Sequence, residues 1–321
     1  MANSILSARV LQNEADAIAW VEARVWPEGP VCPHCGGVER ISKMGGKATR
    51  IGLWKCYQCR KQFTVKVGTV FESSHVPMHL WLQAMYLLCS SKKGISSNQL
   101  HRTLGVTLKT AWFMAHRIRE AMRVVGVEPM GGAGTIVESD ETYIGKLDSA
   151  PTGRGAKPKG YGHKNAVLTL VERGGSARSF HIDGNAISDI MPIVRENIAR
   201  EATVMTDEAK HYYDVADDFA GHKTVKHSAE EYVRNEFWIE GDKLHIESIH
   251  TNTVEGYYSI FKRGMKGVYQ HCKEKHLHRY LAEFDFRYSN RVRLGVDDVE
   301  RTERAVKGIV GKRLTYRTSH I

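Results

Sequence analysis

Two closely spaced cysteine pairs constrain the fold of the N-terminal part of this chain more than any other feature. Cys32 and Cys35 flank Pro-His, Cys56 and Cys59 flank Tyr-Gln, and a polar, Gly-rich stretch with a β-like run at Thr49–Trp54 lies between the pairs. Each CxxC turn places two thiolates on one side of a tetrahedral zinc ion, so two turns complete its coordination. Zinc binding supplies on the order of 10 to 16 kcal/mol, more than burial provides in so short a segment. We therefore predict a small β ribbon built around a structural Zn²⁺.

The overall charge favours a polyanionic partner. The 321 residues include 46 Lys and Arg against 36 Asp and Glu, a formal net charge of +10. Such an excess favours nucleic acid, although it also keeps a protein soluble without any such partner. No apolar run reaches the roughly 18 residues of a membrane span, and the chain does not open with a basic segment followed by an apolar core. We therefore expect a cytoplasmic protein that binds nucleic acid and no membrane.

Three helices are predicted after the ribbon, and the last two have the lengths, the short turn and the capping residue that are typical of a helix-turn-helix. Pro77–Ser90 is an apolar helix, Ile95–Leu104 is a short one, and Thr107 caps a third that runs to about Arg123. Apolar residues recur at helical spacing on the third helix, which leaves a polar side that could enter a major groove. An ordinary helical hairpin between two domains remains an alternative. The side chains predicted to contact DNA are Lys109, Thr110 and Arg117.

A glycine-rich stretch at residues 126–134 marks the main domain boundary, because beyond it strand-like runs alternate with helices. This alternation predicts an α/β sheet. We expect three parts: an N-terminal helix and zinc ribbon at residues 1–72, a helix-turn-helix segment at 73–126, and an α/β domain at 127–321.

Carboxylates in three distant segments of the α/β part are candidates for a metal site. Alternation along the strand Thr135–Ile144 places Glu138, Asp140 and Thr142 on one face, in an apolar context where acids rarely lie without a partner. Asp207 directly follows a short strand, at the edge where open α/β sheets bind ligands.

The third segment is a predicted helix that begins near His250. Asn252, Glu255 and Lys262 lie on one side of it by helical spacing. Two carboxylates about 4 Å apart repel by roughly 4 kcal/mol at an effective dielectric constant of about 20, so a convergent trio needs cations or must take up protons. Hard oxygen ligands select Mg²⁺ or Mn²⁺, and a pair of such ions suits displacement at phosphorus.

The motifs as a set resemble one family. The two CxxC turns, the helix-turn-helix, and the blocks VESDETYIGK, VMTDEAKHY and HTNTVEGYYSIFKRG are similar to bacterial insertion-sequence transposases of the ISXO-type group, over roughly residues 12 to 290. The resemblance implies a zinc ribbon joined to a DDE catalytic domain, with an RNase H-like mixed sheet and flanking helices. It also implies Asp140 and Asp207 as the first two metal ligands, Glu255 as the third, and Lys262 as a DNA contact near the cut.

The third ligand has an alternative, because some relatives are described with Asn in this place and Asn252 lies one turn from Glu255. We prefer Glu255, since its charge balances a dication and its spacing to Lys262 fits. Glu141 and Glu208 each follow an aspartate and are expected to point elsewhere. His227 and His250 are expected either to support the site by hydrogen bonds or simply to pack or lie exposed.

The resemblance implies a DNA transposase that binds the terminal inverted repeats of its element, cleaves DNA, and joins the freed ends to target DNA. It also implies at least a homodimer, because two ends must be held together. A bacterial cytoplasmic protein, associated with the nucleoid when bound to DNA, is the expected setting. The alternatives are a zinc-ribbon DNA-binding regulator without catalysis, a simple metal-dependent nuclease, and an inactive copy.

Overall fold

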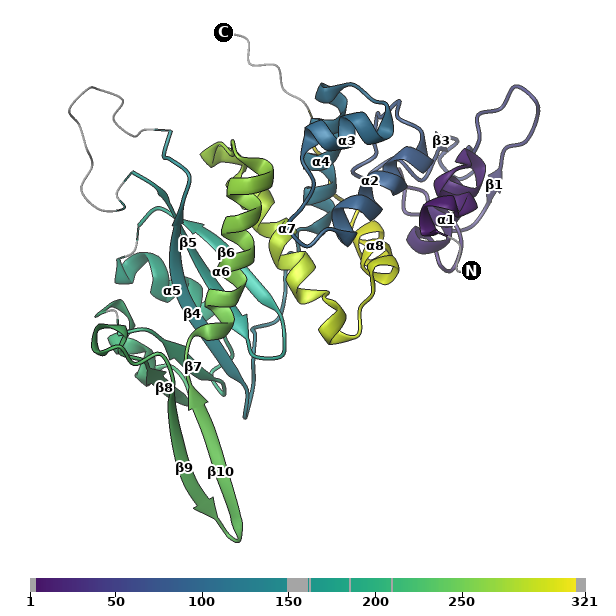
Figure 1. The fold of residues 1–321 in the computed structure, drawn as a ribbon. Coiled ribbons are helices and arrows are strands. Elements are labelled where there is room, and N and C mark those ends of the chain that lie inside the picture. Colours follow the sequence, from purple (N-terminus) through teal and green to yellow (C-terminus); the bar gives the residue numbers. More distant parts are fainter. Residues whose placement is uncertain (1–3, 149–160, 162, 185, 209, 316–321) are drawn as a thin grey trace, which may run out of the picture. The chain divides into compact units, whose positions relative to one another are not determined.

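The computed structural model describes residues 4–148, 161, 163–184, 186–208 and 210–315 (Figure 1). The chain divides into two compact units. We call Met1–Arg123 with Val296–Ile321 the N-terminal unit, and Val124–Gly295 the sheet unit. Among the described residues no helix is long and apolar enough to cross a membrane.

The N-terminal unit begins with a helix and a three-stranded antiparallel ribbon. Helix α1 (Glu14–Val25) is capped by Asn13, and the ribbon consists of β1 (Ile41–Lys43), β2 (Trp54–Cys56) and β3 (Gln62–Phe63). The prediction of a β-like run at Thr49–Trp54 is wrong, because only Trp54 of this run lies in a strand. Gly52 there adopts φ +73°, and a Cβ on it would lie 2.6 Å from the Ile18 side chain of α1, so the chain turns where the helix packs against it.

The three predicted helices follow as α2 (Met78–Ser90), α3 (Ser97–Leu104) and α4 (Leu108–Met122). The hydroxyl groups of Ser96 and Thr107 cap the starts of α3 and α4. Gly105 ends α3 in the left-handed conformation at φ 66°, which produces the short turn between the two helices.

One residue of the predicted DNA-contacting side lies inside the unit. Arg117 is only 5% exposed and donates to the carbonyl oxygen of Glu72 at 2.9 Å, so it supports the fold instead of lying on an open polar face. The prediction failed because the second half of α4 is buried on all sides, including His116 and Arg119. Lys109 is exposed and Thr110 is half-buried at the start of the helix.

The C-terminal segment folds with the N-terminal unit, whereas the sequence analysis assigned residues 127–321 to one domain. Helix α8 (Asp298–Lys307) was not predicted. The buried Arg301 on α8 donates to the carbonyl oxygen of Cys89 at the end of α2, at 2.9 Å. The amide of Val70 donates to the carbonyl oxygen of Ile309 at 3.2 Å. These bonds attach the segment to the helices that precede the sheet in sequence.

The sheet unit contains a five-stranded mixed sheet with the order β6-β5-β4-β7-β8. Its strands are β4 (Ile136–Ile144), β5 (Asn165–Glu172), β6 (Ala177–Ile182), β7 (Thr203–Thr206) and β8 (Gly221–Thr224). The pairs β4–β5 and β5–β6 are antiparallel, whereas β7 pairs parallel to β4 and β8 pairs parallel to β7. This is the mixed α/β sheet that the resemblance implied.

Helices cover both faces of this sheet and produce three layers. On one face α5 (Ile187–Asn197) packs against Leu168 and Leu170 of β5. On the other face α6 (Asn252–Gly264) and α7 (Leu277–Ser289) pack against the alternate residues Val167 and Val171 (Figure 1). The nearly continuous burial of β5 follows from this two-sided covering.

Short helical turns complete the described chain. They are Ile5–Ser7, Arg9–Leu11, Lys210–Asp217, His227–Ala229, Met265–Tyr269, Glu274–His276 and Val292–Leu294. Met265–Tyr269 is a π-helical turn that directly extends α6, and the others are 3₁₀ helices.

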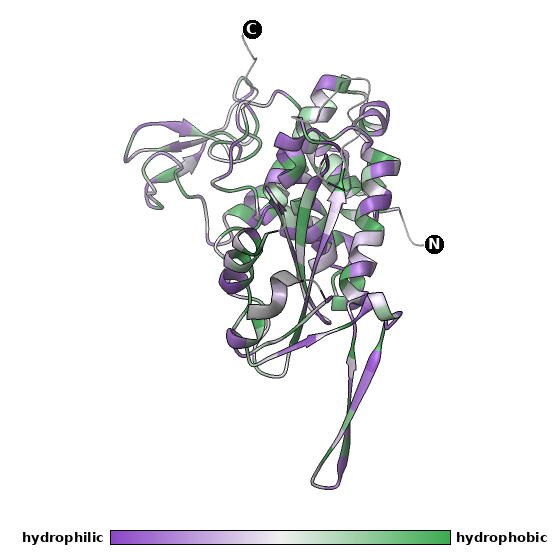
Figure 2. Ribbon diagram, turned by 90° about the vertical axis from the view of Figure 1, so that its left-hand side faces the viewer, coloured by the Kyte–Doolittle hydropathy of each residue, from purple (hydrophilic) through white to green (hydrophobic). Residues whose placement is uncertain are grey.

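A two-stranded hairpin extends from the sheet unit between β8 and α6 (Figures 1 and 2). It consists of β9 (Arg234–Glu240) and β10 (Lys243–Ile249), joined by a two-residue loop with Gly241 at φ +61°. The sequence analysis did not predict it.

Candidate active site and zinc centre

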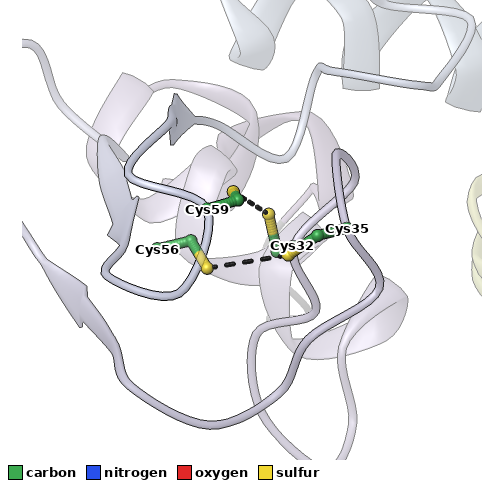
Figure 3. A group of neighbouring side chains, drawn as sticks. All are labelled: Cys32, Cys35, Cys56 and Cys59. Carbon is green, nitrogen blue, oxygen red and sulfur yellow. Dashed lines mark hydrogen bonds between the residues drawn. The ribbon is translucent and has the colours of Figure 1, made fainter.

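The four cysteines of the ribbon meet at one point (Figure 3). All four sulfurs lie within 4.8 Å of one another, and the Sγ atoms of Cys32 and Cys59 are 3.6 Å apart, those of Cys35 and Cys56 3.8 Å. Four thiolates about 2.3 Å from a tetrahedral Zn²⁺ stand about 3.8 Å from each other. The donor set therefore fits zinc, as predicted.

The polypeptide around the quartet favours metal binding. Hydrogen bonds from the backbone amides of Cys59 and Gln58 lower the pKa of Cys56 to about 7, which favours the thiolate that zinc requires. Cys32, Cys56 and Phe63 are buried together against Trp26 and Trp54. Because this core is so small, the ribbon depends on the metal for most of its stability.

Asp140 lies on β4, and Asp207 directly follows β7, the parallel neighbour of β4. In the register between β4 and β7, Ile136 pairs with Thr203 and Glu138 pairs with Met205. Continued by two residues, the same register sets Asp140 beside Asp207, about 5 Å away across the sheet. The spacing of the two aspartates along the sequence is thus the spacing that brings them together.

The carboxylates of the site influence one another. Burial first, and then the negative charges of Glu141, Asp207 and Glu255, raise the pKa of Asp140 to about 8. Asp207 and Glu255 come from separate segments, so the fold brings both within electrostatic reach of Asp140. Among the described residues, however, only the four cysteines meet as a group of three or more potential ligands within 4.8 Å.

A buried carboxylate holds the start of the helix that carries Glu255. Glu138 has no exposed surface, and its oxygens accept hydrogen bonds from the backbone amides of Thr253 and Val254, at 2.8 and 3.0 Å, and from the Thr253 hydroxyl at 2.7 Å. These amides belong to the first turn of α6, which has no partners for them within the helix. A negative charge there also suits the helix dipole.

Arg173 balances the charge of Glu138. Its Nε donates to Glu138 at 2.6 Å, and its two terminal nitrogens donate to the carbonyl oxygens of Ser248 and His250 at 2.7 and 2.8 Å. Burial and the charge of Arg173 lower the pKa of His250, so its neutral Nδ1 accepts from the amide of Asn252 at 3.3 Å. His250 therefore supports the start of α6, which was one of its two expected roles.

Glu255 lies on the exposed side of the first turn of α6. Its Oε1 accepts a hydrogen bond from the Thr251 hydroxyl at 3.1 Å and lies 3.7 Å from Nε2 of His227. Asn252 is also exposed. His227 is thus a neighbour of the predicted third ligand, and the choice between Glu255 and Asn252 remains a prediction.

The adjacent acids point elsewhere, as alternation predicted. Glu141 accepts a hydrogen bond from the buried hydroxyl of Tyr212. Glu208 accepts from the amide and hydroxyl of Ser228, at 2.9 and 2.8 Å, and these bonds lower its pKa.

Lys262 lies near Asp140, and two further lysines act on it. Burial lowers the pKa of Lys262, the nearby Asp140 opposes this effect, and the charges of Lys266 and Lys164 lower the pKa further. The four charges therefore lie within electrostatic reach of one another, which is an arrangement that suits an incoming phosphate.

Comparisons with known proteins agree with this architecture. A family model described as a transposase zinc-ribbon domain matches residues 12–62, and one described as an ISXO2-like transposase domain matches residues 131–289. An uncharacterized protein in transposable element ISH50 of Halobacterium salinarum is 26% identical over 275 residues, which cover 82% of this chain and 86% of that protein.

The matched domains define the class of this protein as a transposase. The chain belongs to the insertion-sequence transposases that join a zinc ribbon to an ISXO2-like, RNase H-like DDE domain. The fold class expected from the sequence is confirmed, and the four-cysteine centre is its structural zinc site.

Zinc content tests the ribbon centre. We expect one zinc ion per chain by atomic absorption, and loss of that ion in Cys32→Ser, because three thiolates leave the coordination incomplete. The matched control is Cys272→Ser, which lies outside the quartet and should keep the metal. A wild-type protein without zinc, folded as judged by tryptophan fluorescence, would contradict the assignment.

The pH dependence of stability tests the convergence of the carboxylates. Since the folded state holds the Asp140 proton up to about pH 8 and the unfolded state releases it near pH 4, stability contributed by this group falls as the pH rises between these values. In magnesium-free buffer, Asp140→Asn should raise the melting temperature at pH 8.5 and have much less effect at pH 5, by calorimetry. The exposed Asp183→Asn is the control; a pH-independent effect of Asp140→Asn would refute the convergence.

Hydrogen exchange tests the role of Glu138. In Glu138→Gln we expect faster exchange of the amides at the start of α6, measured by mass spectrometry on a peptide spanning residues 251–256, and a loss of about 1–3 kcal/mol of stability. Glu236→Gln, an exposed partner of Lys223, should leave that peptide unchanged. Equal exchange in both variants would mean that Glu138 does not hold the helix.

Proposed function

We propose that this transposase binds the ends of its own element, cleaves DNA there and joins the freed 3′ ends to target DNA, with Asp140, Asp207 and Glu255 as the ligands of a divalent metal pair. The observation that best supports this is the raised pKa of Asp140, because its causes include, after burial, the charges of the other two residues. Three acids that share one site need Mg²⁺ or Mn²⁺ to ionise together at neutral pH.

Bound between these carboxylates, two hard cations would supply an activated water and stabilise the leaving oxygen. The chain's own residues do the positioning. Asp140 lies on β4 and Asp207 directly follows the neighbouring strand β7, and Glu138 fixes the helix that carries Glu255. Rigid placement of this kind contributes to catalysis because in-line displacement at phosphorus demands alignment.

Cleavage in this proposal is hydrolysis that leaves a 3′-OH on the element end. That hydroxyl then attacks a phosphodiester of the target, a new bond forms to its phosphorus, and the target's own 3′ oxygen leaves. Because each step exchanges one phosphate ester bond for another or for water, no covalent protein intermediate is needed. Lys262, with Lys164 and Lys266, would hold the phosphate backbone beside the carboxylates.

Recognition of the terminal inverted repeats is assigned to the N-terminal unit. The exposed Lys109 and the half-buried Thr110 at the start of α4 remain candidates for contacts with DNA. Arg117 is withdrawn from this role because it is buried. A chain that holds two element ends at once acts at least as a dimer, in the cytoplasm and on the nucleoid.

A strand-transfer assay with element-end DNA, target DNA and Mg²⁺ tests the proposal. Asp140→Ala, Asp207→Ala and Glu255→Ala should each lower joining at least about 10³-fold, since each removes a charge that holds the metal pair. Binding of end DNA by gel shift should persist in all three, because the N-terminal unit is untouched.

Asn252→Ala is the matched control, since Asn252 lies on the same exposed turn of α6 as Glu255. Loss of joining at Asn252 with retention at Glu255 would transfer the third ligand to Asn252. Cleavage without joining in the wild type would point to a nuclease, and binding without cleavage to a DNA-binding regulator. Joining that survives Asp140→Ala or Asp207→Ala would end the proposed mechanism.

A further inference from the structure

The β9–β10 hairpin has one face that is entirely uncharged. In its register Phe237 pairs with Ile246 and Ile239 with Leu244, so these four side chains share a face. They are 62%, 60%, 74% and 62% exposed, respectively. Asn235 and Ser248 end this face, hydrogen-bonded to each other at 2.7 Å. We call these six residues the apolar hairpin face.

The opposite face of the hairpin already has partners. Lys223 of β8 contacts Glu236 and Glu247 at 2.7 and 2.5 Å, and the rings of Trp238 and His245 stack at 5.3 Å. Ile249 is buried with Met205 at the base. The opposite face is therefore partly packed, with Trp238 still 44% exposed, whereas all four large hydrophobic side chains of the apolar hairpin face lie exposed to water.

Such a hairpin is expected to be only marginally stable in water by itself. Two-stranded sheets are marginally stable without further packing, and in the described part of the chain β9 and β10 pair only with each other. Scattered exposed apolar residues are ordinary, but a contiguous group on one flat face marks an interaction site.

The charge distribution decides which partner fits. DNA binding draws its affinity from cations on phosphates, and the apolar hairpin face has none. The charged side chains that the structure describes on β9 and β10, those of Arg234, Lys243, Glu236 and Glu247, alternate onto the other face. Over residues 234–249 the sequence has one Arg and one Lys against four acids, so the hairpin is a poor surface for a polyanion.

An uncharged, self-complementary face suits a second copy of the same face. Two such sheets stack without bringing like charges together, and a two-fold axis lets the same residues serve both partners. We propose that the apolar hairpin face pairs two copies of this transposase. This inference names the surface that would form the dimer of the proposed function. It rests on that function only for the reason why two chains must pair.

The size of the contact predicts its strength. Four large side chains provide an apolar patch of a few hundred Å², below the roughly 800 Å² per partner of a standard stable interface. The pairing is therefore of moderate affinity and concentration-dependent, and binding of two chains to joined element ends would strengthen it by raising their effective concentration.

Analytical ultracentrifugation of the full-length zinc-loaded protein, without DNA, tests the pairing. We expect a monomer–dimer equilibrium in the wild type between about 1 and 100 µM, and at least a tenfold weaker dimer in Ile239→Asp and in Ile239→Lys. An equimolar mixture of these two variants should regain dimer, because opposite charges then meet across the axis. Val292→Lys, at an exposed apolar residue elsewhere in the sheet unit, is the matched control and should dimerise as the wild type does.

Several outcomes would overturn the pairing: a wild type that stays monomeric throughout this range, an Ile239 variant that dimerises normally, or an Ile239 variant that loses DNA affinity while remaining dimeric. The result is independent of catalysis, because neither DNA nor Mg²⁺ is present. In the strand-transfer assay, Ile239→Asp should still nick a single element end while paired joining falls. Loss of nicking as well would contradict a purely pairing role.

Discussion

The buried carboxylate of Glu138 is the interaction on which the geometry of the sheet unit depends. It receives two backbone amides and a hydroxyl from the first turn of α6 and the guanidinium of Arg173, with no exposed surface of its own. Asp140 stands two residues along the same strand, on the same face. The anchor of α6 and the first acid of the candidate site are therefore fixed by one strand register, and a slip of one residue would turn both to the opposite face. Glu255 and Lys262 lie on α6, so the hydrogen bonds of Glu138 to the first turn of this helix also help to fix their positions.

Two of the acids on β4, Glu138 and Asp140, show how differently the environment of a carboxylate can act on its charge. Glu138 has hydrogen-bond donors on both oxygens and a cation in contact, so it stays within the fold as a structural anion. Asp140 accepts a bond from the amide of Glu141 but has other acids as neighbours, and its pKa rises to about 8. A fold gains nothing from such repulsion, and groups of like charge gathered in this way are typical of sites that bind a cation. The contrast separates the scaffold from the chemistry without reference to any relative.

Much of this arrangement was readable in the sequence, for identifiable reasons. The cysteine turns and the capped helices rest on local rules, and Asp140 and Asp207 stand out because acids at a buried strand and at a strand end are conspicuous. The partner of Glu138 was not predictable, since it lies more than a hundred residues away on α6. Helix α8 was missed because Arg301 reads as a surface cation until its contact with Cys89 is known. The hairpin did have a sequence signal that the prediction did not use. Apolar and polar residues alternate on both sides of Gly241-Asp242, which is typical of two strands joined by a tight turn.

The placement of arginines limits what net charge says about DNA binding. Arg117, Arg119, Arg287 and Arg301 are all buried, and Arg173 is committed to Glu138 and to backbone carbonyls. These cations count toward the net charge of +10, but they lie inside their own units and not on a surface open to DNA. The positive charge near the carboxylates comes instead from Lys164, Lys262 and Lys266, whose compact ammonium groups on flexible stems contact phosphate as point charges. The total charge is therefore a poor guide to the surface around Asp140, where lysines supply the positive charge.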